Sequence, residues 1–311
     1  MHILSFDGML KPETIEVIEM KYAKKAAGFD KINIGDTIQS PITGDTYELK
    51  FIDDFNGDSL NTDWWTIHNM IYADAEEQVN IPENVEVSHS HLIIYGRKSG
   101  KKYTGKKHSG QTYTSFFTAG SIKSEHKKYF KFGRIEMLAK LPFSQGMWPA
   151  FWTMGENCRW PWGGEIDIME MVGGTDKWNN YNRDAQYQAA LHWCDPAMDP
   201  TDAWGEKASN LNIGNYELPG RMKGEKLADH YHVIGIEWTE KRIQPYIDNI
   251  PFGGFDIDKD ETMREAFFEN HFLILNLAIG GSWAGSPDSF SPSVWPQKYM
   301  VDWIKVWQIK E

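Results

Sequence analysis

Residues 164–172 read GEIDIMEMV, and this stretch predicts a β-strand that carries three acidic side chains. Glu165 and Asp167 alternate with isoleucines, which is the two-residue period of a strand with one buried face and one open face. Strict alternation would turn Glu170 toward the buried face, where an unpaired carboxylate costs several kcal/mol. One extra residue, accommodated as a β-bulge, restores the alternation and brings Glu170 beside the other two acids.

The spacing of the acids on this bulged strand indicates catalysis. Glu165 and Glu170 become four strand positions apart, or about 13 Å between their Cα atoms. Two extended glutamates that lean toward each other leave roughly 5–6 Å between the carboxylates, which is the separation of retaining glycosidases. The negative charges also raise the pKa of whichever glutamate lacks a strong hydrogen-bond donor. The alternative is a solvated acidic edge strand with no chemistry.

Short β-rich runs precede and follow this strand. Each has a few residues rich in Ile, Val, Tyr, Phe and Trp, and Gly, Pro, Asn or Asp separate the runs. Few windows among them show a helical pattern, and the best one, residues 261–269, is short. Many short strands without alternating helices predict an all-β fold, an antiparallel β-sandwich. The runs are 85–87, 92–95, 121–124, 133–141, 147–154, 165–172, 233–238, 243–247, 272–279 and 299–308.

The first 47 residues differ from the rest of the chain. Residues 12–27 suggest a short helix with interleaved Lys and Glu, and turn residues follow at Gly35, Pro41 and Gly44. We therefore predict an N-terminal appendage over residues 1–47 and a single main domain over residues 48–311.

The charge of the chain narrows the choice of partners. The net charge is −12, from 32 basic and 44 acidic residues. No basic patch stands out against this acidic background, and the KKYTGKK stretch at residues 101–107 is interpreted as a solvated hairpin tip. We therefore expect no nucleic-acid partner, no acidic membrane surface and no sulfated substrate.

The remaining composition points to a neutral ligand and leaves the compartment open. Fourteen tryptophans are either an aromatic core or flat platforms for sugar rings. No run of about 18 apolar residues is present, as a membrane span requires, and no signal peptide is visible at the N-terminus. Cys158 and Cys194 permit at most one disulfide.

Several motifs in chain order resemble glycoside hydrolase family sixteen, in its laminarinase-like branch. The acidic strand resembles the bulged form of that family's E-I-D-I-M-E signature, and the likeness covers roughly residues 49–309. The other matching segments are DDFNG at 53–57 with Leu60 and Trp64, FGRIE at 132–136 with KLP at 140–142, GMWPAFW at 146–152, IEW at 236–238 with Asp248, NLAIGG at 276–281 with Trp283, and VDWIKV at 301–306.

This resemblance implies a fold, a site and a reaction. The fold is a concanavalin-like β-jelly-roll with an open substrate cleft on its concave sheet. Glu165 is the nucleophile, Glu170 the general acid/base and Asp167 the residue that holds and tunes them, in a double displacement through a glycosyl-enzyme intermediate. No cofactor is required for this chemistry.

Other candidate residues are expected around the acids. Trp148 and Trp152 share one strand face and are interpreted as sugar platforms, with core packing as the alternative. His192 is expected to hydrogen-bond the acids or a sugar. Three weaker candidates for the non-reducing side of the cleft are Asn69, Arg134 and Trp283.

Two further expectations concern a metal and a disulfide. Asp302 resembles an aspartate that helps to bind a structural calcium in many family members. The glycine of the usual D-G-x-L turn is replaced here, where residues 88–92 read SHSHL, which puts that calcium in question. A bridge between Cys158 and Cys194 would form if the acidic strand neighbours the His192 segment.

The leading functional hypothesis is a secreted, monomeric endo-β-1,3-glucanase that also accepts mixed-linkage β-1,3/1,4-glucan. A neutral galactan hydrolase of the agarase kind and a transglycosylase would use the same acids. A non-catalytic glucan-binding protein is a fourth alternative, although its relatives lose the catalytic glutamates, which are all present here. The altered segment before Val79, which reads DAEEQ at 74–78, indicates a change in the glycone subsites.

Overall fold

The computed structural model describes residues 32–69, 76–107, 110–156, 160–176, 181–194, 209–217, 223–287 and 294–310. Side chains are described for these residues except at 175–176, 181 and 209–215. Residues 34–311 form one compact unit, and the fold described below is that of this unit. Within the described residues, no helix is long and apolar enough to cross a membrane.

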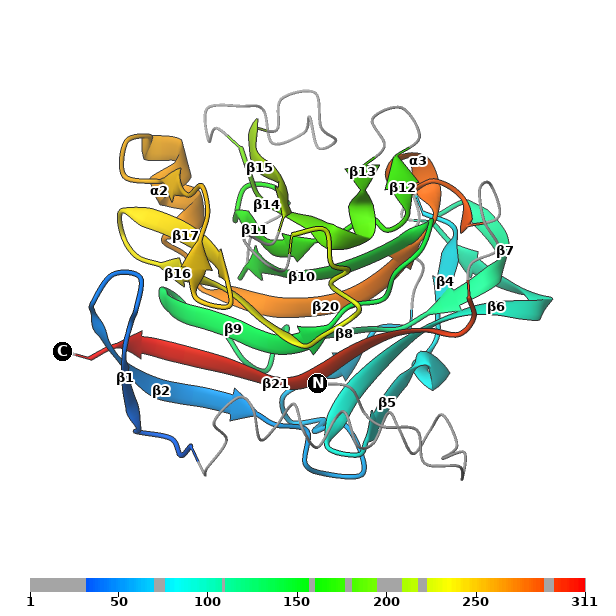
Figure 1. Ribbon diagram of the computed structural model, residues 1–311, viewed down its shortest axis with the longest axis horizontal. Helices are drawn as coiled ribbons and strands as arrows, with labels where there is room; N and C mark the ends of the chain where they lie inside the picture. The colour runs from blue at the N-terminus through cyan, green and yellow to red at the C-terminus, as the bar shows by residue number, and fades with distance from the viewer. Residues whose placement is uncertain are drawn as a thin grey trace. The chain divides into compact units, whose positions relative to one another are not determined.

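The unit consists almost entirely of strands (Figure 1). The strands are β1 (Thr37–Gln39), β2 (Thr46–Asp53), β3 (Thr66–Ile67), β4 (Gln78–Asn80), β5 (Val85–Ser88), β6 (His91–Lys106), β7 (Thr112–Ala119), β8 (Ser121–Lys123), β9 (Gly133–Lys140), β10 (Met147–Gly155), β11 (Glu165–Glu170), β12 (Thr175–Asp176), β13 (Tyr181–Asn182), β14 (Gln186–Trp193), β15 (Ser209–Glu217), β16 (His232–Trp238), β17 (Arg242–Ile247), β18 (Ile250–Pro251), β19 (Phe255–Asp256), β20 (His271–Ile279) and β21 (Gln297–Ile309). Short helices are η1 (Pro82–Asn84), η2 (Arg183–Ala185), α2 (Glu261–Phe267) and α3 (Gly281–Ala284).

Two large sheets carry these strands. The seven-stranded sheet has the order β15-β14-β11-β10-β20-β8-β3. The larger sheet follows the path β18-β17-β16-β9-β21-β6-β7-β4, with β1, β2, β5 and β19 paired beside it. All pairs are antiparallel except β4 with β7. The predicted β-sandwich is therefore confirmed, and its long strands β9, β10, β20 and β21 curve in the same sense (Figure 1).

The hydrophobic core lies between the two sheets and follows the alternation of the sequence. Ile135, Met137 and Ala139 point inward from β9, while Leu273 and Leu275 point inward from β20. Because successive residues of a strand face opposite sides, the neighbours of these residues lie on the outer faces. The outer face of the seven-stranded sheet is therefore where the acids of β11 are placed.

The start of the main unit differs from the predicted boundary. Residues 37–47 were expected to be a loop of the appendage, but β1 pairs with β2 through Ile38 and Tyr47 and adds a strand to the larger sheet. Tyr47 is fully buried, so apolar packing draws this segment into the sheet. The predicted helix at residues 12–27 lies outside the described residues.

Candidate active site

The strand β11 contains the bulge that the position of Glu170 predicts. Glu165 lies opposite Met154 on β10, and Glu170 lies opposite Ala150. Six residues of β11 therefore lie against five residues of its neighbour, with the irregularity between Asp167 and Glu170. The same count holds on the other side, where His192 and Gln188 of β14 face the two glutamates. The predicted spacing of four strand positions is confirmed.

The bulge sorts the side chains of β11 between core and open face. Ile168 and Met169 are consecutive, yet both are fully buried in the core between the sheets. Glu165 and Glu170 remain half-buried on the outer face, and Asp167 between them is 3% exposed. Burial of two consecutive apolar residues therefore turns the third acid outward.

Asp167 lies between the two glutamates of β11 and contacts His192. The imidazole Nε2 of His192 lies 3.1 Å from Asp167 Oδ2, an ion-pair contact when the ring is protonated. One carboxylate oxygen of Glu165, one carboxylate oxygen of Asp167 and one ring nitrogen of His192 all lie within 4.8 Å of one another. The expected contact between His192 and the acids is thus present.

Each glutamate has its own hydrogen-bond donors. Trp160 Nε1 donates to Glu165. Glu170 accepts from Trp148 Nε1 at 3.0 Å and from Gln188 Nε2 at 3.2 Å. Two donors on one carboxyl fix its orientation toward the open face.

Burial raises the pKa of all three acids. For Glu165 the second cause is the charge of Asp167, while His192 and the Trp160 donor oppose the rise in pKa. For Asp167 the charge of Glu170 adds to burial, and a hydrogen bond with Glu165 opposes it. For Glu170 the donors Gln188 and Trp148 partly offset burial, so its pKa is also raised. The three carboxyls therefore keep their protons to higher pH than isolated carboxyls would.

Three tryptophans lie on or beside the open face, and their predicted contact with sugar rings stays a prediction. Trp148 and Trp152 of β10 are both half-buried on the face that carries the acids. The ring of Trp148 packs edge-on against Trp283 of α3, at 4.7 Å between ring centroids. Trp152 Nε1 donates to Asn276 Oδ1 at 2.7 Å. Because Trp283 is 37% exposed, one aromatic surface continues from Glu170 to the rim of the face.

The sequence reasoning missed three residues of this site. Gln188 lies four residues before His192 on β14, and this spacing could have indicated that both face the acidic strand. Trp160 precedes the acidic strand, and its hydrogen bond to Glu165 depends on how the chain before that strand folds back. Asn276 was noted only within a family motif, although it shares a face with Trp152 across the β10–β20 pair.

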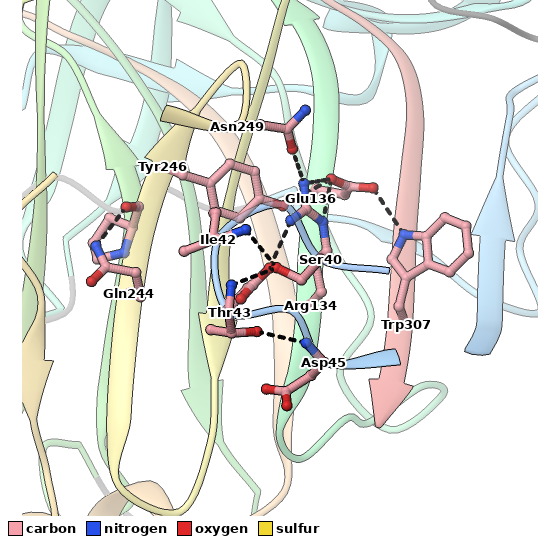
Figure 2. Close-up of polar contacts among 12 residues, drawn as sticks. Ser40, Ile42, Thr43, Asp45, Arg134, Glu136, Gln244, Tyr246, Asn249 and Trp307 are labelled. Carbon is pink, nitrogen blue, oxygen red and sulfur yellow. Dashed lines mark hydrogen bonds and ion pairs between the residues drawn. The ribbon is translucent and has the colours of Figure 1, made fainter. Parts of the chain in front are cut away.

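The expectation for Arg134 is wrong. Arg134 belongs to β9 of the larger sheet and is only 3% exposed. Its Nε donates to Glu136 at 3.0 Å and its Nη1 donates to Glu237 at 2.7 Å, while Nη2 donates to Asn249. These partners fill the guanidinium fork, so no donor is directed to a sugar (Figure 2).

The buried network around Arg134 explains the polar residues of β9. Glu136 also accepts hydrogen bonds from Tyr246 and from Trp307, each at 2.8 Å. Ser40 donates to Glu237. The two-residue period of a strand puts Arg134 and Glu136 on one face, but it does not show which sheet that strand joins.

Asn69 remains a prediction. It is exposed and follows β3, the edge strand of the seven-stranded sheet. Three strands separate β3 from β11, which is roughly 19 Å at the usual strand spacing. Contact between Asn69 and a bound chain would therefore be far from the acids.

The described residues near Asp302 do not fit the calcium site that the resemblance implies. Asp302 is fully buried in β21, and the register that pairs Val301 with Leu92 brings it beside His91. His91 Nδ1 bonds the carbonyl oxygen of His89 at 2.8 Å, which occupies a carbonyl of the turn. The positive charge of Lys305 also acts on Asp302. A cation and an imidazole beside one carboxylate are a poor oxygen cage for Ca²⁺.

The proposed disulfide also stays a prediction. Cys194 is buried at the end of β14, and β14 does neighbour β11 as the hypothesis required. Cys158 lies outside the described residues.

Comparisons with known proteins agree with this geometry. The family model described as "Beta-porphyranase A-D, GH16 domain" matches residues 48–309. The endo-β-1,3-glucanase structure from Pyrococcus furiosus has a TM-score of 0.71 and 27% identity, covering 90% of this chain and 100% of that one. The β-glucanase of Rhodothermus marinus is 29% identical over 73% of this chain and 71% of its own length.

The chain is shorter than several of its relatives. The glucan endo-1,3-beta-glucosidase A1 of Niallia circulans is 26% identical over 90% of this chain, but the match covers only 40% of that protein. For another relative, the clotting factor G alpha subunit of Tachypleus tridentatus, the match covers 34% of that protein. The family model nevertheless covers most of this chain, and the resemblance shown by the motifs is confirmed. The chain belongs to glycoside hydrolase family 16.

Proposed function

We propose that this protein is a retaining endo-β-glucanase that hydrolyses β-1,3-glucan and mixed-linkage β-1,3/1,4-glucan. The observation that carries the proposal is the bulged strand β11, which puts three acids on the open face with Glu165 and Glu170 four strand positions apart. That spacing suits carboxylates about 5–5.5 Å apart, which leaves no room for a water to attack directly. One glutamate must then be the nucleophile.

Glu165 is the proposed nucleophile and Glu170 the proposed general acid/base. In the first step a Glu165 oxygen attacks the anomeric carbon, the glycosidic C–O bond breaks, and Glu170 gives its proton to the leaving oxygen. In the second step Glu170 takes a proton from water, and the resulting hydroxide releases the sugar from Glu165. The donors Trp148 and Gln188 hold the Glu170 carboxyl in place for both proton transfers.

Asp167 is the proposed tuning residue between the two glutamates. Its charge raises the pKa of Glu165, and His192 lies against its far oxygen. As a proton moves through the cluster, Asp167 offers a third carboxyl that can share it. This keeps one glutamate ionised and the other protonated within the same pH range.

The substrate is inferred from relatives. The similar proteins from Pyrococcus furiosus and Rhodothermus marinus are an endo-β-1,3-glucanase and a β-glucanase. The half-exposed tryptophans Trp148, Trp152 and Trp283 suit flat, uncharged sugar rings. A polymer bound across such an open face is cut internally.

A second candidate substrate follows from the family model. Its description names beta-porphyranases, so porphyran should be tested beside agarose as a galactan alternative. A hydrolase on galactan would use the same three acids.

Three accompanying features belong to the proposal. We expect a monomer that acts outside the cell, where polysaccharides are found, and that has no membrane partner. No cofactor takes part in either step. The structural calcium of the resemblance is left out of the proposal, because the contacts of His91 and Lys305 do not suit it.

Product analysis tests the proposed function. The protein is incubated with laminarin, barley glucan, lichenan, agarose and porphyran, and product lengths and anomers are followed over time. We expect internal cleavage of the first three with retention of configuration. Glu165→Gln should lose at least about 10³-fold in kcat, whereas Glu240→Gln, an exposed control of the same chemistry, should keep activity. Cleavage of porphyran or agarose alone would replace the glucan substrate, and full activity of Glu165→Gln would refute the mechanism.

A further inference from the structure

The hairpin of β6 and β7 is a strongly basic segment of an acidic protein. Between Glu86 and Glu125 the chain has no acidic residue. The same stretch contains seven basic residues, namely Arg97, Lys98, Lys101, Lys102, Lys106, Lys107 and Lys123. The net charge of the whole chain hides this local excess, so the expectation that no basic patch is present needs revision.

The outer half of this hairpin, residues 98–117, extends beyond the strands that flank its base. The pairing of β21 with β6 ends at Gly96, and the pairing of β4 with β7 begins at Phe117. Beyond these points the described residues of the two strands pair with each other, for example Thr104 with Thr114. Figure 1 shows β6 and β7 at the same end of the molecule as α3.

One face of the outer half is exposed and carries lysine, threonine and an aromatic ring. Lys102, Thr104 and Lys106 alternate along β6 on this face and are exposed. Phe116 of β7 is 43% exposed, and the ammonium of Lys102 lies 5.4 Å from the centroid of its ring. Among the described residues, no carboxylate forms an ion pair with Lys101, Lys102 or Lys106. These cations are therefore available to a ligand.

The opposite face holds the hairpin in a defined position near the open face of the seven-stranded sheet. Tyr103 and Tyr113 pack against Val79 of β4, and Tyr113 donates to the carbonyl of Glu77. Glu77 N donates to Ile279 O at 2.7 Å, where β20 ends and α3 with Trp283 begins. The hairpin is thus connected to the rim of the proposed active site.

We propose that the exposed face of this hairpin binds an anionic polysaccharide, one with sulfate or carboxylate groups. Lysine ammonium groups pair with the anionic groups, threonine hydroxyls bond sugar hydroxyls, and the ring of Phe116 supports a sugar face. The surface lies outside the three acids and would hold the enzyme on a charged polymer while it cuts a neutral one. It therefore extends the proposed function without deciding which glucan is cleaved.

The exposed face favours a polysaccharide over other polyanions. A membrane surface would require apolar side chains to insert between lipids, and Phe116 is the one large exposed hydrophobic residue that the described part of the hairpin offers. Thr104 between Lys102 and Lys106 instead matches a ligand that carries both hydroxyl and anionic groups.

Affinity measurements with dextran sulfate test the proposal. Dextran sulfate has no β-glucan linkage, so its binding is measured independently of hydrolysis. Failure of the binding proposal and failure of the proposed hydrolytic function can therefore be distinguished. The double variant Lys102→Gln, Lys106→Gln is compared with a matched double variant at exposed lysines elsewhere, Lys241→Gln, Lys259→Gln. Thermal melts check that both fold, and unsulfated dextran is the neutral ligand.

The expected result is specific to the hairpin. Its double variant should bind dextran sulfate at least about 10-fold more weakly at low salt, and the slope of log K against log salt should fall by about 1.4, since two counterion-releasing contacts are lost. The matched double variant should bind as the wild type does. Equal loss in both double variants, equal binding of unsulfated dextran, or stronger binding of phosphatidylserine vesicles or duplex DNA than of dextran sulfate would each overturn the proposal.

Discussion

Replacing Asp167 by asparagine should make the protein more stable and less active. The change is nearly isosteric, and it removes a carboxylate that is only 3% exposed and lies between Glu165 and Glu170. Burial and the Glu170 charge raise the pKa of Asp167 in the folded protein. An acid with a raised pKa stabilises the fold below its unfolded pKa, and that contribution is lost as pH rises through the folded value. Above about pH 4, repulsion among the carboxylates therefore increasingly destabilises the native protein.

The distances in the cluster set the size of this effect. One carboxylate oxygen of Asp167 lies within 4.8 Å of one carboxylate oxygen of Glu165. At that distance two full charges repel by about 3.5 kcal/mol at an effective dielectric constant of 20. A shared proton and His192 reduce this repulsion, so we expect a gain of about 1–2 kcal/mol at pH 8. That corresponds to a rise of about 2–5 °C in Tm for a domain of this size.

Thermal melts between pH 4 and pH 9 measure the gain, and kcat on laminarin is followed in parallel. The difference in Tm between Asp167→Asn and wild type should be near zero at pH 4 and should grow with pH, while kcat falls about 10²-fold. Asp58→Asn, at an exposed position, serves as the control and should change neither. A Tm difference that is constant with pH, or a less stable variant at pH 8, would show that the three carboxyls do not repel one another.

Four further measurements test other parts of the structure. Trp148→Phe removes a donor that lowers the pKa of Glu170, so the alkaline limb of kcat/KM should move to higher pH; an unmoved limb would separate Trp148 from the acid. Burial lowers the pKa of His271 to about 4, so wild type should lose about 3 kcal/mol as pH falls from 6.5 to 4, and urea melts of His271→Gln should lack this loss. Arg134→Met leaves two buried glutamates without their cation and should cost about 3–5 kcal/mol, partly recovered when Glu237→Gln is added; no recovery would contradict the network. EDTA should change Tm by less than about 1 °C, because His91 and the positive charge of Lys305 do not suit a calcium site at Asp302, and a larger drop would restore the metal site.

The sequence predicts much of the fold and the core of the site for one physical reason. A strand has a two-residue period, so a charged residue out of phase, such as Glu170, has to be explained by a bulge or by a buried partner. Apolar Met169 at the open-face position indicated the bulge, and the register confirms it. Family motifs added the order of the segments.

What the sequence does not predict depends on which strands become neighbours. Arg134 has the same local pattern whether its strand joins the acidic sheet or the other one, and only the pairing of β9 with β16 and β21 decides this. Gln188 likewise becomes a donor to Glu170 through the β11–β14 register. Such long-range pairings are made by the whole core, and no local window contains them.

The extra residue of β11 has a consequence for how the length of this strand can change. Strands β10 and β14 each advance four residues while β11 advances five, and the additional side chain fills space between the sheets. A shortened chain that lacks Met169 would read EIDIE, keep its acids in phase with both neighbours and lose only packing. The position of the acids and the packing of the core are thus separable in this strand. The core volume lost in such a deletion would be restored by a larger side chain at another core position.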